Sequence, residues 1–438
     1  MINLFPQQIP NYERLREILK TSRFAINLSE LGSGKSIIAL KLANDFERII
    51  VISYPAVINQ NWKPLLEKYK ISAETITINA LRGRKNYALN NSFLERDGDR
   101  YAATDQWKQI AGMRTLLIID EFQMTKNKNV SARAVREMIS YIGGSSRVLL
   151  MSGTPVDQPD QILNYLKMLG MVSKKRKYAD LAEITGDESV NCFNFDQKLA
   201  AYFRDVFLPK YSDRMAPSPR NLVGFLGYIQ LTGTAQIDAG EAVKSLENLC
   251  SKDRLETSDN CSIKTHLQRI ELLKIPFLGK NIRASLQQKK KVVVALFYLD
   301  SILALARELR DLKPRVIIGE TKNSERDEII SRFQEPTHRC RLIIANADII
   351  STGINLDDAH GNFPRICFLA SNYKSMISHQ LFYRFSRITT KSPSEIVVLF
   401  CRNLNEDRVL KILAQKTRVL KDFSSSSVYF DDFKPIDL

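Results

Sequence analysis

Short apolar runs alternate with amphipathic helical stretches in two separate parts of the chain, and this alternation constrains the fold more than any other feature. In the first part, the expected strands are FAINL (24–28), RIIVIS (48–53), TLLIID (115–120) and RVLLMS (147–152). They are apolar almost throughout, as are parallel strands that are covered on both faces. The intervening stretches, such as 37–46 and 57–69, have helical spacing of apolar residues. This part therefore predicts a doubly wound α/β domain.

The alternation returns in a second part of the chain, after a long stretch of different character. Residues from about 157 to 285 read mostly as helix and loop. The strands expected after this stretch are VVVALF (292–297), RVIIG (315–319), RLIIA (341–345), RICFLA (365–370) and EIVVLF (395–400). We therefore expect an N-terminal α/β lobe over 1–156, a mainly helical insertion over 157–285, a C-terminal α/β lobe over 286–422 and a flexible tail over 423–438.

A glycine-rich turn follows the first expected strand, in the sequence SELGSGKS (29–36). Such a loop binds phosphate because its backbone N–H groups point inward and a helix N-terminus adds positive potential. Gly32, Ser33 and Gly34 supply the loop, Lys35 neutralises the β- and γ-phosphates, and Ser36 binds Mg²⁺. We expect Lys35 to face solvent in the empty loop. The alternative is a glycine-rich turn that binds nothing.

The usual phosphate-loop pattern has a glycine where this chain has Ser29. None of the functions of the loop depends on that position, provided that the order strand, loop, helix is kept. The sequence keeps this order, and we therefore expect a nucleotide site here.

Two adjacent carboxylates, Asp120 and Glu121, lie where the expected strand TLLIID ends and the sequence DEFQ begins. Asp120, at the strand tip, suits Mg²⁺ coordination, and Glu121 suits polarising an attacking water molecule. The alternative is a strand end followed by a solvated acidic turn.

The net charge, the cysteines and the apolar runs limit the kinds of partner and compartment that we expect for this protein. A formal net charge of +16 at pH 7 favours a polyanionic partner, although a device for solubility would give the same balance. The six cysteines are scattered, and the spacing of Cys250, Cys261 and His266 fits no common zinc site. The N-terminus does not read as a signal peptide, and the longest apolar run (292–299) is too short to span a bilayer. We expect a soluble protein in a reducing compartment, cytoplasmic or nuclear, with no membrane partner.

A series of motifs resembles the signature of superfamily 2 helicases and translocases, nearest the Swi/Snf-like branch. The series contains DEFQ (120–123), then TKNKN (125–129) and LLMSGTP (149–155). In that family the phosphate loop lacks the earlier glycine, which accounts for Ser29. VISYPAVINQNW (51–62) resembles the family motif after the first helix, with Pro55 and Trp62 at matching places. LFPQQ (4–8) resembles the short motif whose glutamine reads adenine, which implies that role for Gln8.

The second half carries further motifs of the series. In HQLFYRFSRITTKS (379–392), Gln380, Arg384 and Arg387 resemble Q-x-x-G-R-x-x-R. On a helix these offsets would place all three on one face, and the resemblance implies that the arginines stabilise charge on the transferred phosphoryl group. Tyr383 replaces the family glycine, which makes the assignment of Arg384 less direct. The alternative is a basic helix face in solvent.

The sequence ANADIISTGINLDD (345–358) resembles the fifth family motif, which touches both ATP and the nucleic-acid backbone. The resemblance implies that Gly353 binds the nucleotide. It also implies that five polar residues couple hydrolysis to motion: Gln123, Ser152, Thr154, Thr352 and Asn355.

The resemblance implies two RecA-like lobes in tandem that bind ATP and Mg²⁺ between them and move along DNA or RNA, with DNA favoured. Two rival functions stay open: a motor subunit of a packaging or restriction-type complex, and a nucleic-acid-binding scaffold with little turnover. Lysine-rich runs at Lys174–Lys177 and Lys289–Lys291 would add grip on nucleic acid or are solvated faces. Residues 157–285 would bind protein partners, and HGNFPRICFLASNYKSMISHQ (360–380) resembles helicase-like proteins of large DNA viruses.

Overall fold

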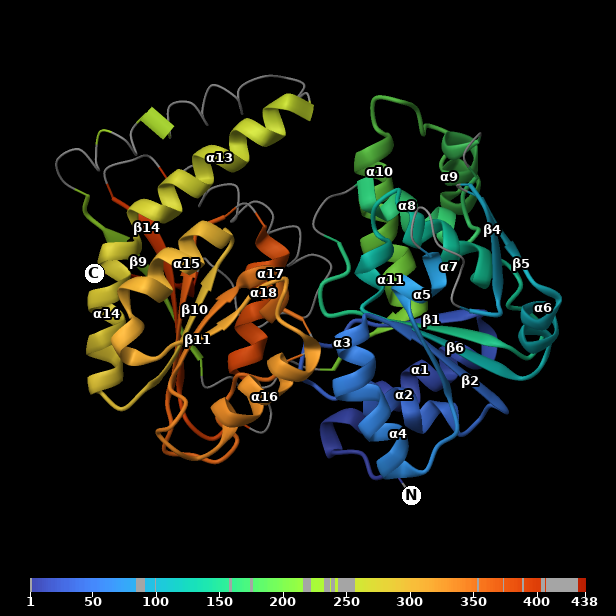
Figure 1. The fold of residues 1–438 in the computed structure, drawn as a ribbon. Coiled ribbons are helices and arrows are strands. Elements are labelled where there is room, and N and C mark those ends of the chain that lie inside the picture. Colours follow the sequence, from blue (N-terminus) through green and yellow to red (C-terminus); the bar gives the residue numbers. More distant parts are fainter. Residues whose placement is uncertain are drawn as a thin grey trace. The chain divides into compact units, whose positions relative to one another are not determined.

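The computed structural model describes residues 2–83, 91–98, 100–156, 160–173, 176–215, 222–231, 237, 241–242, 257–352, 354–372, 374–387, 390–402, 406 and 432–438. These residues form two compact units (Figure 1). Unit 1 holds the described residues up to 215, and unit 2 holds those from 222 to the C-terminus. Each unit is built on its own sheet, and each is described by itself below.

Unit 1 contains a six-stranded parallel sheet in the order β3-β2-β6-β7-β1-β8. The strands are β1 (Phe24–Asn27), β2 (Arg48–Ser53), β3 (Glu74–Thr77), β6 (Thr115–Asp120), β7 (Arg147–Met151) and β8 (Ser212–Asp213). Alternate residues of the central strands enter cores on opposite faces, so that in β1 Ile26 packs on one face and Ala25 on the other. This burial on both faces explains why the central strands β2, β6 and β7 are apolar almost throughout.

Helices cover both faces of this sheet. They are α1 (Ile9–Thr21), α2 (Lys35–Ala43), α3 (Pro55–Val57), α4 (Lys63–Tyr69), α5 (Ile78–Arg82), α6 (Asp105–Gly112), α7 (Val130–Ser140), α8 (Asp160–Met168), α9 (Lys177–Thr185), α10 (Phe195–Tyr202) and α11 (Leu208–Tyr211). Short turns of other types are η1 (Pro6–Gln8), η2 (Ile58–Trp62), η3 (Phe122–Thr125) and η4 (Phe203–Phe207). A hairpin of β4 (Leu94–Asp97) and β5 (Arg100–Ala103) stands apart from the sheet.

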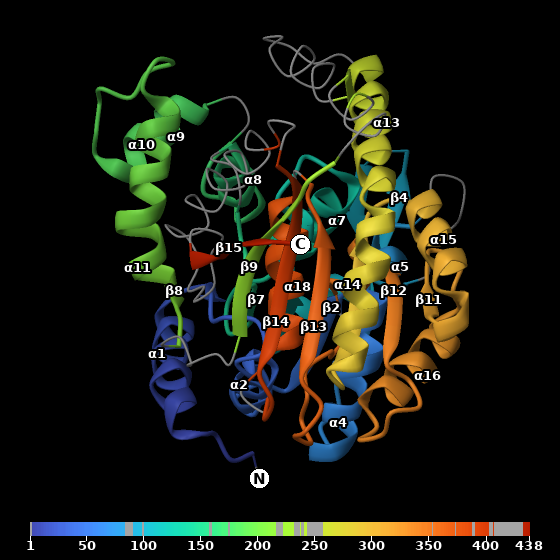
Figure 2. The same ribbon diagram turned by 90° about the vertical axis from the view of Figure 1, so that its left-hand side faces the viewer.

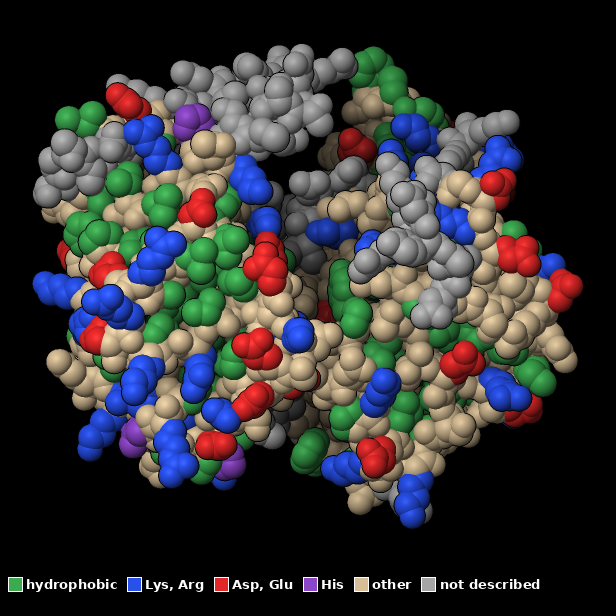
Figure 3. Space-filling model, in the orientation of Figure 1, with side chains coloured by type: hydrophobic (Ala, Val, Ile, Leu, Met, Phe, Trp, Pro, Cys, Tyr) green, Lys and Arg blue, Asp and Glu red, His purple; other side chains and the backbone are tan. Residues whose placement is uncertain are grey.

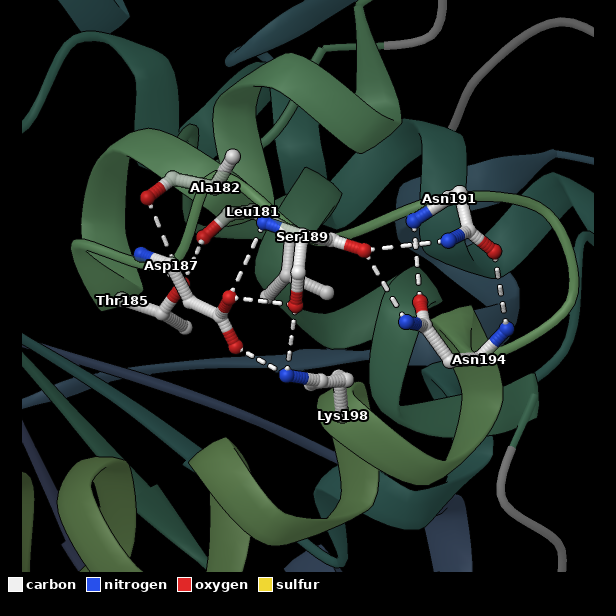
Figure 4. Close-up of polar contacts among 8 residues, drawn as sticks. All are labelled: Leu181, Ala182, Thr185, Asp187, Ser189, Asn191, Asn194 and Lys198. Carbon is white, nitrogen blue, oxygen red and sulfur yellow. Dashed lines mark hydrogen bonds and ion pairs between the residues drawn. The ribbon is translucent and has the colours of Figure 1, made fainter.

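A polar network fixes the connection between α9 and α10 (Figure 4). Asp187 accepts hydrogen bonds from the ammonium of Lys198 and, at 2.6 Å, from the hydroxyl of Ser189. Asn191 and Asn194 close the turn, because each side-chain oxygen accepts from the backbone N–H of the other. These contacts hold α9 against α10 on the core of unit 1.

Unit 2 contains a seven-stranded parallel sheet in the order β11-β12-β10-β13-β14-β9-β15 (Figure 2). The strands are β9 (Leu222–Ile229), β10 (Lys291–Leu296), β11 (Arg315–Ile317), β12 (Leu342–Asn346), β13 (Arg365–Ala370), β14 (Ser394–Cys401) and β15 (Lys434–Asp437). Around them lie α13 (Thr257–Leu273), α14 (Ile275–Gln287), α15 (Leu299–Glu308), η5 (Arg310–Leu312), α16 (Asn323–Gln334), α17 (Ala347–Ile350) and α18 (Ser375–Phe385). The predicted fold class of two parallel-sheet, RecA-like lobes in tandem is therefore confirmed.

The segment 157–285 is shared between the two units instead of lying apart from them. Helices α8 to α11 pack on the core of unit 1, and α13 and α14 pack on the core of unit 2. The segment also contains β8 and β9, which extend the sheets of unit 1 and unit 2, respectively.

The expectation of a flexible tail is wrong for residues 432–438. Strand β15 pairs in parallel with β9, and the Phe433 side chain is buried in the core of unit 2. Glycines in β9 make room for this packing, since a Cβ atom at Gly224 would overlap the Phe433 ring and one at Gly227 would crowd Leu438. The strand is therefore held by side-chain packing that a reading of the tail alone does not detect.

Among the described residues, no helix is long and apolar enough to cross a membrane.

Candidate nucleotide site

Three loops leave the sheet of unit 1 at the same edge. Asn27 at the end of β1 and Asp120 at the end of β6 both pair with Met151 at the end of β7. Strand β7 lies between the other two, so the segment after Met151 runs between the glycine loop and the acidic pair. The carboxyl edge of a parallel sheet is where ligands bind in open α/β folds.

The glycine loop joins β1 to α2. Gly32 and Gly34 have φ angles of 75° and 88°, which side chains rarely adopt, and Gly34 immediately precedes α2. Lys35 is 8% exposed, and its ammonium donates to the backbone carbonyls of Ser29 at 2.9 Å and Glu30 at 3.0 Å. The expectation that Lys35 faces solvent is therefore wrong, because carbonyls of its own loop accept its hydrogen bonds.

Ser29 stands at the position of the usual glycine and anchors the start of the loop through two hydrogen bonds. Its backbone N–H donates to the side-chain oxygen of Asn27 at 3.1 Å, and its hydroxyl accepts from the backbone N–H of Met215 at 2.9 Å. Met215 follows β8 closely, so the Ser29 hydroxyl ties the glycine loop to the segment after β8. A glycine at this position could not make that bond.

Gln8 lies against the same loop and is 1% exposed. Its amide nitrogen donates to the Ser33 carbonyl at 3.1 Å, and its amide oxygen accepts from Phe5 N at 3.0 Å. The structure therefore brings Gln8 to the loop, while its reading of adenine stays a prediction.

Asp120 is 5% exposed and accepts hydrogen bonds on both carboxylate oxygens. The Trp62 indole N–H donates to Oδ2 at 2.8 Å, and Glu121 N donates to Oδ1 at 3.0 Å. Burial, followed by the charge of Glu121, raises the pKa of Asp120 to about 7, although Trp62 and Lys35 oppose this shift. Two buried, adjacent carboxylates are therefore a position where a cation would be strongly favoured.

The donors at this position fit Mg²⁺. Asp120 supplies a carboxylate and Ser36 a hydroxyl, and Mg²⁺ prefers oxygen ligands. Consecutive residues contact both of them: Asn61 donates to Ser36 Oγ at 2.8 Å, and Trp62 donates to Asp120 Oδ2 at 2.8 Å.

Glu121 has a backbone φ of 58°, which is uncommon for a residue other than glycine. Its carboxylate is 7% exposed and accepts from the Gln123 amide. Burial and the charge of Glu121 together raise the pKa of Tyr54 to about 12. A residue held in a strained conformation is typical of functional sites.

The segment after β7 packs directly on the glycine loop. A Cβ atom at Gly153 would lie 3.0 Å from Leu31 N, so only glycine permits this approach without a shift of the neighbouring atoms. Ser152 Oγ accepts from Thr154 N at 3.0 Å. Among the described residues, the buried Thr154 Oγ1 and Gln123 Oε1 have no hydrogen-bond partner. Such buried polar atoms are rare in folded proteins, and these two belong to the loops at the carboxyl edge of the sheet.

The predicted residues of the second half lie together within unit 2. Gln380 and Arg384 are on α18 and are 4% and 6% exposed. Helix α18 ends at Phe385, and Arg387 therefore lies beyond it. The expectation that Gln380, Arg384 and Arg387 share one helix face is wrong in this respect, because the backbone becomes extended at Ser386.

Both arginines contact the predicted fifth motif instead. Arg384 Nε donates to the Ser351 carbonyl at 2.7 Å, and an Arg387 guanidinium nitrogen donates to the Ile354 carbonyl at 3.3 Å. Within this motif, Thr352 is half-buried and Asn355 is exposed. Gly353 lies outside the described residues.

The lysine-rich runs differ from a simple solvated face. Lys291 is fully buried, and its ammonium donates to the carbonyls of Phe333 at 2.7 Å and Glu335 at 2.6 Å. Lys291 is therefore not placed to grip nucleic acid. In the other run, Lys174 and Lys175 lie outside the described residues. Basic side chains on the face shown in Figure 3 are spread over each unit and interspersed with acidic ones.

Sequence comparison finds helicases. Residues 273–361 match the model of the helicase conserved C-terminal domain. A protein of Acanthamoeba polyphaga mimivirus, provisionally named an ATP-dependent RNA helicase, is 22% identical over 457 residues, and the match covers 94% of this chain and 82% of that protein. An uncharacterised ATP-dependent helicase of Mycoplasma genitalium is 21% identical over 406 residues, which cover 87% of this chain but 38% of that protein.

Comparison with solved structures finds the SWI2/SNF2 ATPase core of Sulfolobus solfataricus in two forms. The core in complex with double-stranded DNA is 18% identical, with a TM-score of 0.36 and coverage of 97% of this chain and 93% of that chain. The core domain alone is 17% identical, with the same TM-score of 0.36 and coverage of 99% and 92%. At this TM-score the likeness supports no conclusion about function.

The helicase-domain match and the two relatives confirm the resemblance that the ordered motifs indicated. The chain is therefore similar to ATP-dependent helicases, and a viral protein is among its relatives.

Proposed function

We propose that this chain is a superfamily 2 helicase or translocase, which binds ATP with Mg²⁺ at the carboxyl edge of the unit 1 sheet and couples its hydrolysis to movement along DNA. The proposal rests on one observation: strands β1, β7 and β6 end at paired residues on the same edge of the sheet. The loop that leads to Lys35 lies on one side of β7, and Asp120 and Glu121 lie on the other. A phosphate chain in the glycine loop would reach the acidic pair across one strand.

Each residue of unit 1 then has a chemical task. The loop N–H groups from Gly32 to Ser36 bind phosphate oxygens, with the N-terminus of α2 behind them. Lys35 exchanges its carbonyl partners for phosphate oxygens and neutralises their charge. Ser36 and Asp120 hold Mg²⁺, which supplies positive charge against the developing phosphate charge. Glu121 orients the attacking water, and Gln8 contacts the base.

Unit 2 contributes positive charge to the reaction. Arg387 and Arg384 stabilise the transferred phosphoryl group, a role that is worth about 10³ to 10⁵ in rate where it has been measured. Gln380 and Gly353 contact the nucleotide.

Movement along nucleic acid would follow from the contacts that the two arginines make with Ser351 and Ile354. Arg384 and Arg387 bond the carbonyls of Ser351 and Ile354. A shift of the arginines toward phosphate would therefore move Thr352 and Asn355, which we assign to the nucleic-acid backbone. In unit 1, Gln123, Ser152 and Thr154 would couple ATP binding and hydrolysis to the contacts with the nucleic-acid strand in the same way.

DNA is the favoured nucleic-acid substrate, because the motif series most resembles the Swi/Snf-like branch. The net charge of +16 supports a polyanionic partner of either kind. The name of the mimivirus relative makes RNA the alternative.

The experiment is an ATPase titration of the full chain against duplex DNA, single-stranded DNA and RNA, each at two salt concentrations. Stronger stimulation of ATP turnover by DNA than by RNA supports the proposal. Stimulation by RNA alone would show that RNA is the substrate. Turnover that no polymer alters favours a motor that needs a partner subunit. No turnover at all favours a binding scaffold.

A further inference from the structure

Two consecutive side chains reach the two residues that we assign to Mg²⁺. Asn61 Nδ2 lies 2.8 Å from Ser36 Oγ, and Trp62 Nε1 lies 2.8 Å from Asp120 Oδ2. The two acceptors belong to different elements, α2 and the end of β6. One short segment therefore bridges both halves of the candidate metal site.

The backbone of this segment is unusual. Residues Ile58–Trp62 form a π-helical turn between α3 and α4, and Lys63 N bonds to Ile58 O across it. A π turn inserts one extra residue into a helical register and is frequent at functional sites. Asn61 and Trp62 are the last two residues of this turn, and each bonds to one of the two candidate metal ligands.

The Trp62 ring is fixed by its surroundings. It is completely buried in the core between the sheet and α2, where Ile38 and Ile118 belong to the same cluster. Its N–H therefore has a fixed direction. The Asp120 carboxylate accepts from Trp62 on one oxygen and from Glu121 N on the other, so its plane is set from both sides. Each oxygen keeps a further lone pair for a cation.

We infer that Asn61 and Trp62 are positioning residues, which orient Ser36 and Asp120 for a bound Mg²⁺ ion. The inference rests on the proposed function. Groups that hydrogen-bond to metal ligands fix the orientation of those ligands, and their loss typically lowers metal affinity 10- to 100-fold. A purely structural Trp62 would need its ring but not its N–H.

The chain offers a matched control, because it contains only two tryptophans. Trp107 is also completely buried in unit 1, and its indole N–H also makes one hydrogen bond, to the Met138 carbonyl at 3.1 Å. The variants Trp62→Phe and Trp107→Phe therefore each remove one buried indole hydrogen bond and keep an aromatic ring. They differ in whether the lost bond ends on the candidate metal site.

The experiment titrates Mg²⁺ into the full-length protein with a fluorescent ADP analogue, starting in EDTA. We expect Trp62→Phe to raise the Mg²⁺ concentration for half-maximal nucleotide binding about 10- to 100-fold. Asn61→Ala should shift it in the same direction, and Trp107→Phe should leave it unchanged. Thermal unfolding without nucleotide and Mg²⁺ checks that both tryptophan variants fold.

A second readout does not depend on nucleotide turnover. In Trp107→Phe, Trp62 is the one remaining tryptophan, and its emission should change when Mg²⁺ and ADP are added together. The inference is overturned if Trp62→Phe binds Mg²⁺–ADP as the wild type does. If the wild-type protein itself binds no nucleotide in a Mg²⁺-dependent way, the proposed function fails first, and the two failures are thereby distinguished.

Discussion

The amide nitrogen of Gln8 lies 3.1 Å from the Ser33 carbonyl, and this bond joins the N-terminal segment to the glycine loop. The contact is close enough to constrain the next residue as well, since a Cβ atom at Gly34 would overlap the Gln8 amide. The loop, the first helix and the residue assigned to the base therefore form one packed arrangement.

Gly34→Ala should destabilise the protein and abolish nucleotide binding. The φ of 88° at Gly34 alone costs a side chain about 1–2 kcal/mol, and the overlap with Gln8 adds to this. Chemical unfolding and binding of fluorescent ADP measure the two effects. Gly112→Ala is the control, because a Cβ atom there meets nothing within 4 Å, and its stability should stay within about 1 kcal/mol of the wild type.

Glu121→Gly should be more stable than Glu121→Ala, by about 1 kcal/mol. Both variants lose the carboxylate, but only alanine has to hold a Cβ atom at a φ of 58°. At an ordinary position, alanine would be the more stable residue. Denaturant midpoints decide the order, and neither variant should turn over ATP. Equal midpoints would show that the backbone at residue 121 relaxes without cost.

Ser29→Ala should lower the free energy of unfolding by about 1–3 kcal/mol, since it leaves the buried Met215 N–H without an acceptor. Ser29→Gly, which restores the usual phosphate-loop residue, should lose as much. The exposed Ser140→Ala, whose hydroxyl bonds only within its own helix, is the control and should have little effect. A fully stable Ser29→Gly would contradict the anchoring role.

Phe433→Ala should destabilise unit 2 by about 3–5 kcal/mol, as expected for a buried phenylalanine. The Phe433 ring lies 5.2 Å from that of Phe382 on α18, the helix that also carries Arg384. ATP turnover should therefore fall together with the unfolding temperature. The exposed Lys434→Ala should change neither quantity, and a wild-type melting curve for Phe433→Ala would mean that β15 does not support α18.

Strands that are buried on both faces could be predicted from the sequence. Strands β2, β6 and β13 begin and end at the predicted residues, because continuous apolar runs of this length are typical of central parallel strands. Strand β9 was not predicted, because it lies in the stretch 157–285 that was expected to be mostly helix and loop, and it contains Gly224 and Gly227. In the structure they provide space for Phe433 and Leu438, which are distant in sequence.

The candidate site could be predicted as a set of residues, but not in its internal contacts. Local motifs identified Lys35 and Asp120, because Asp120 ends an apolar strand and Lys35 begins the helix after a glycine-rich loop. The burial of Lys35 depends on carbonyl directions within the loop, which no sequence pattern encodes. The position of Arg387 depends on where α18 ends, and helix ends are the least predictable part of an element. The contact of Asn61 with Ser36 depends on a π turn, which has no sequence signature.

The central claim of the proposed function is that the Arg387 guanidinium stabilises the transferred phosphoryl group of ATP. Single-turnover ATP hydrolysis by Arg387→Ala, with Mg²⁺ and saturating duplex DNA, tests it most directly, with the exposed Arg339→Ala as control. We predict that Arg387→Ala binds ATP normally but hydrolyses it about 10³-fold more slowly or worse, while Arg339→Ala matches the wild type. Wild-type hydrolysis by Arg387→Ala, alongside an inactive Lys35→Ala, would contradict the claim.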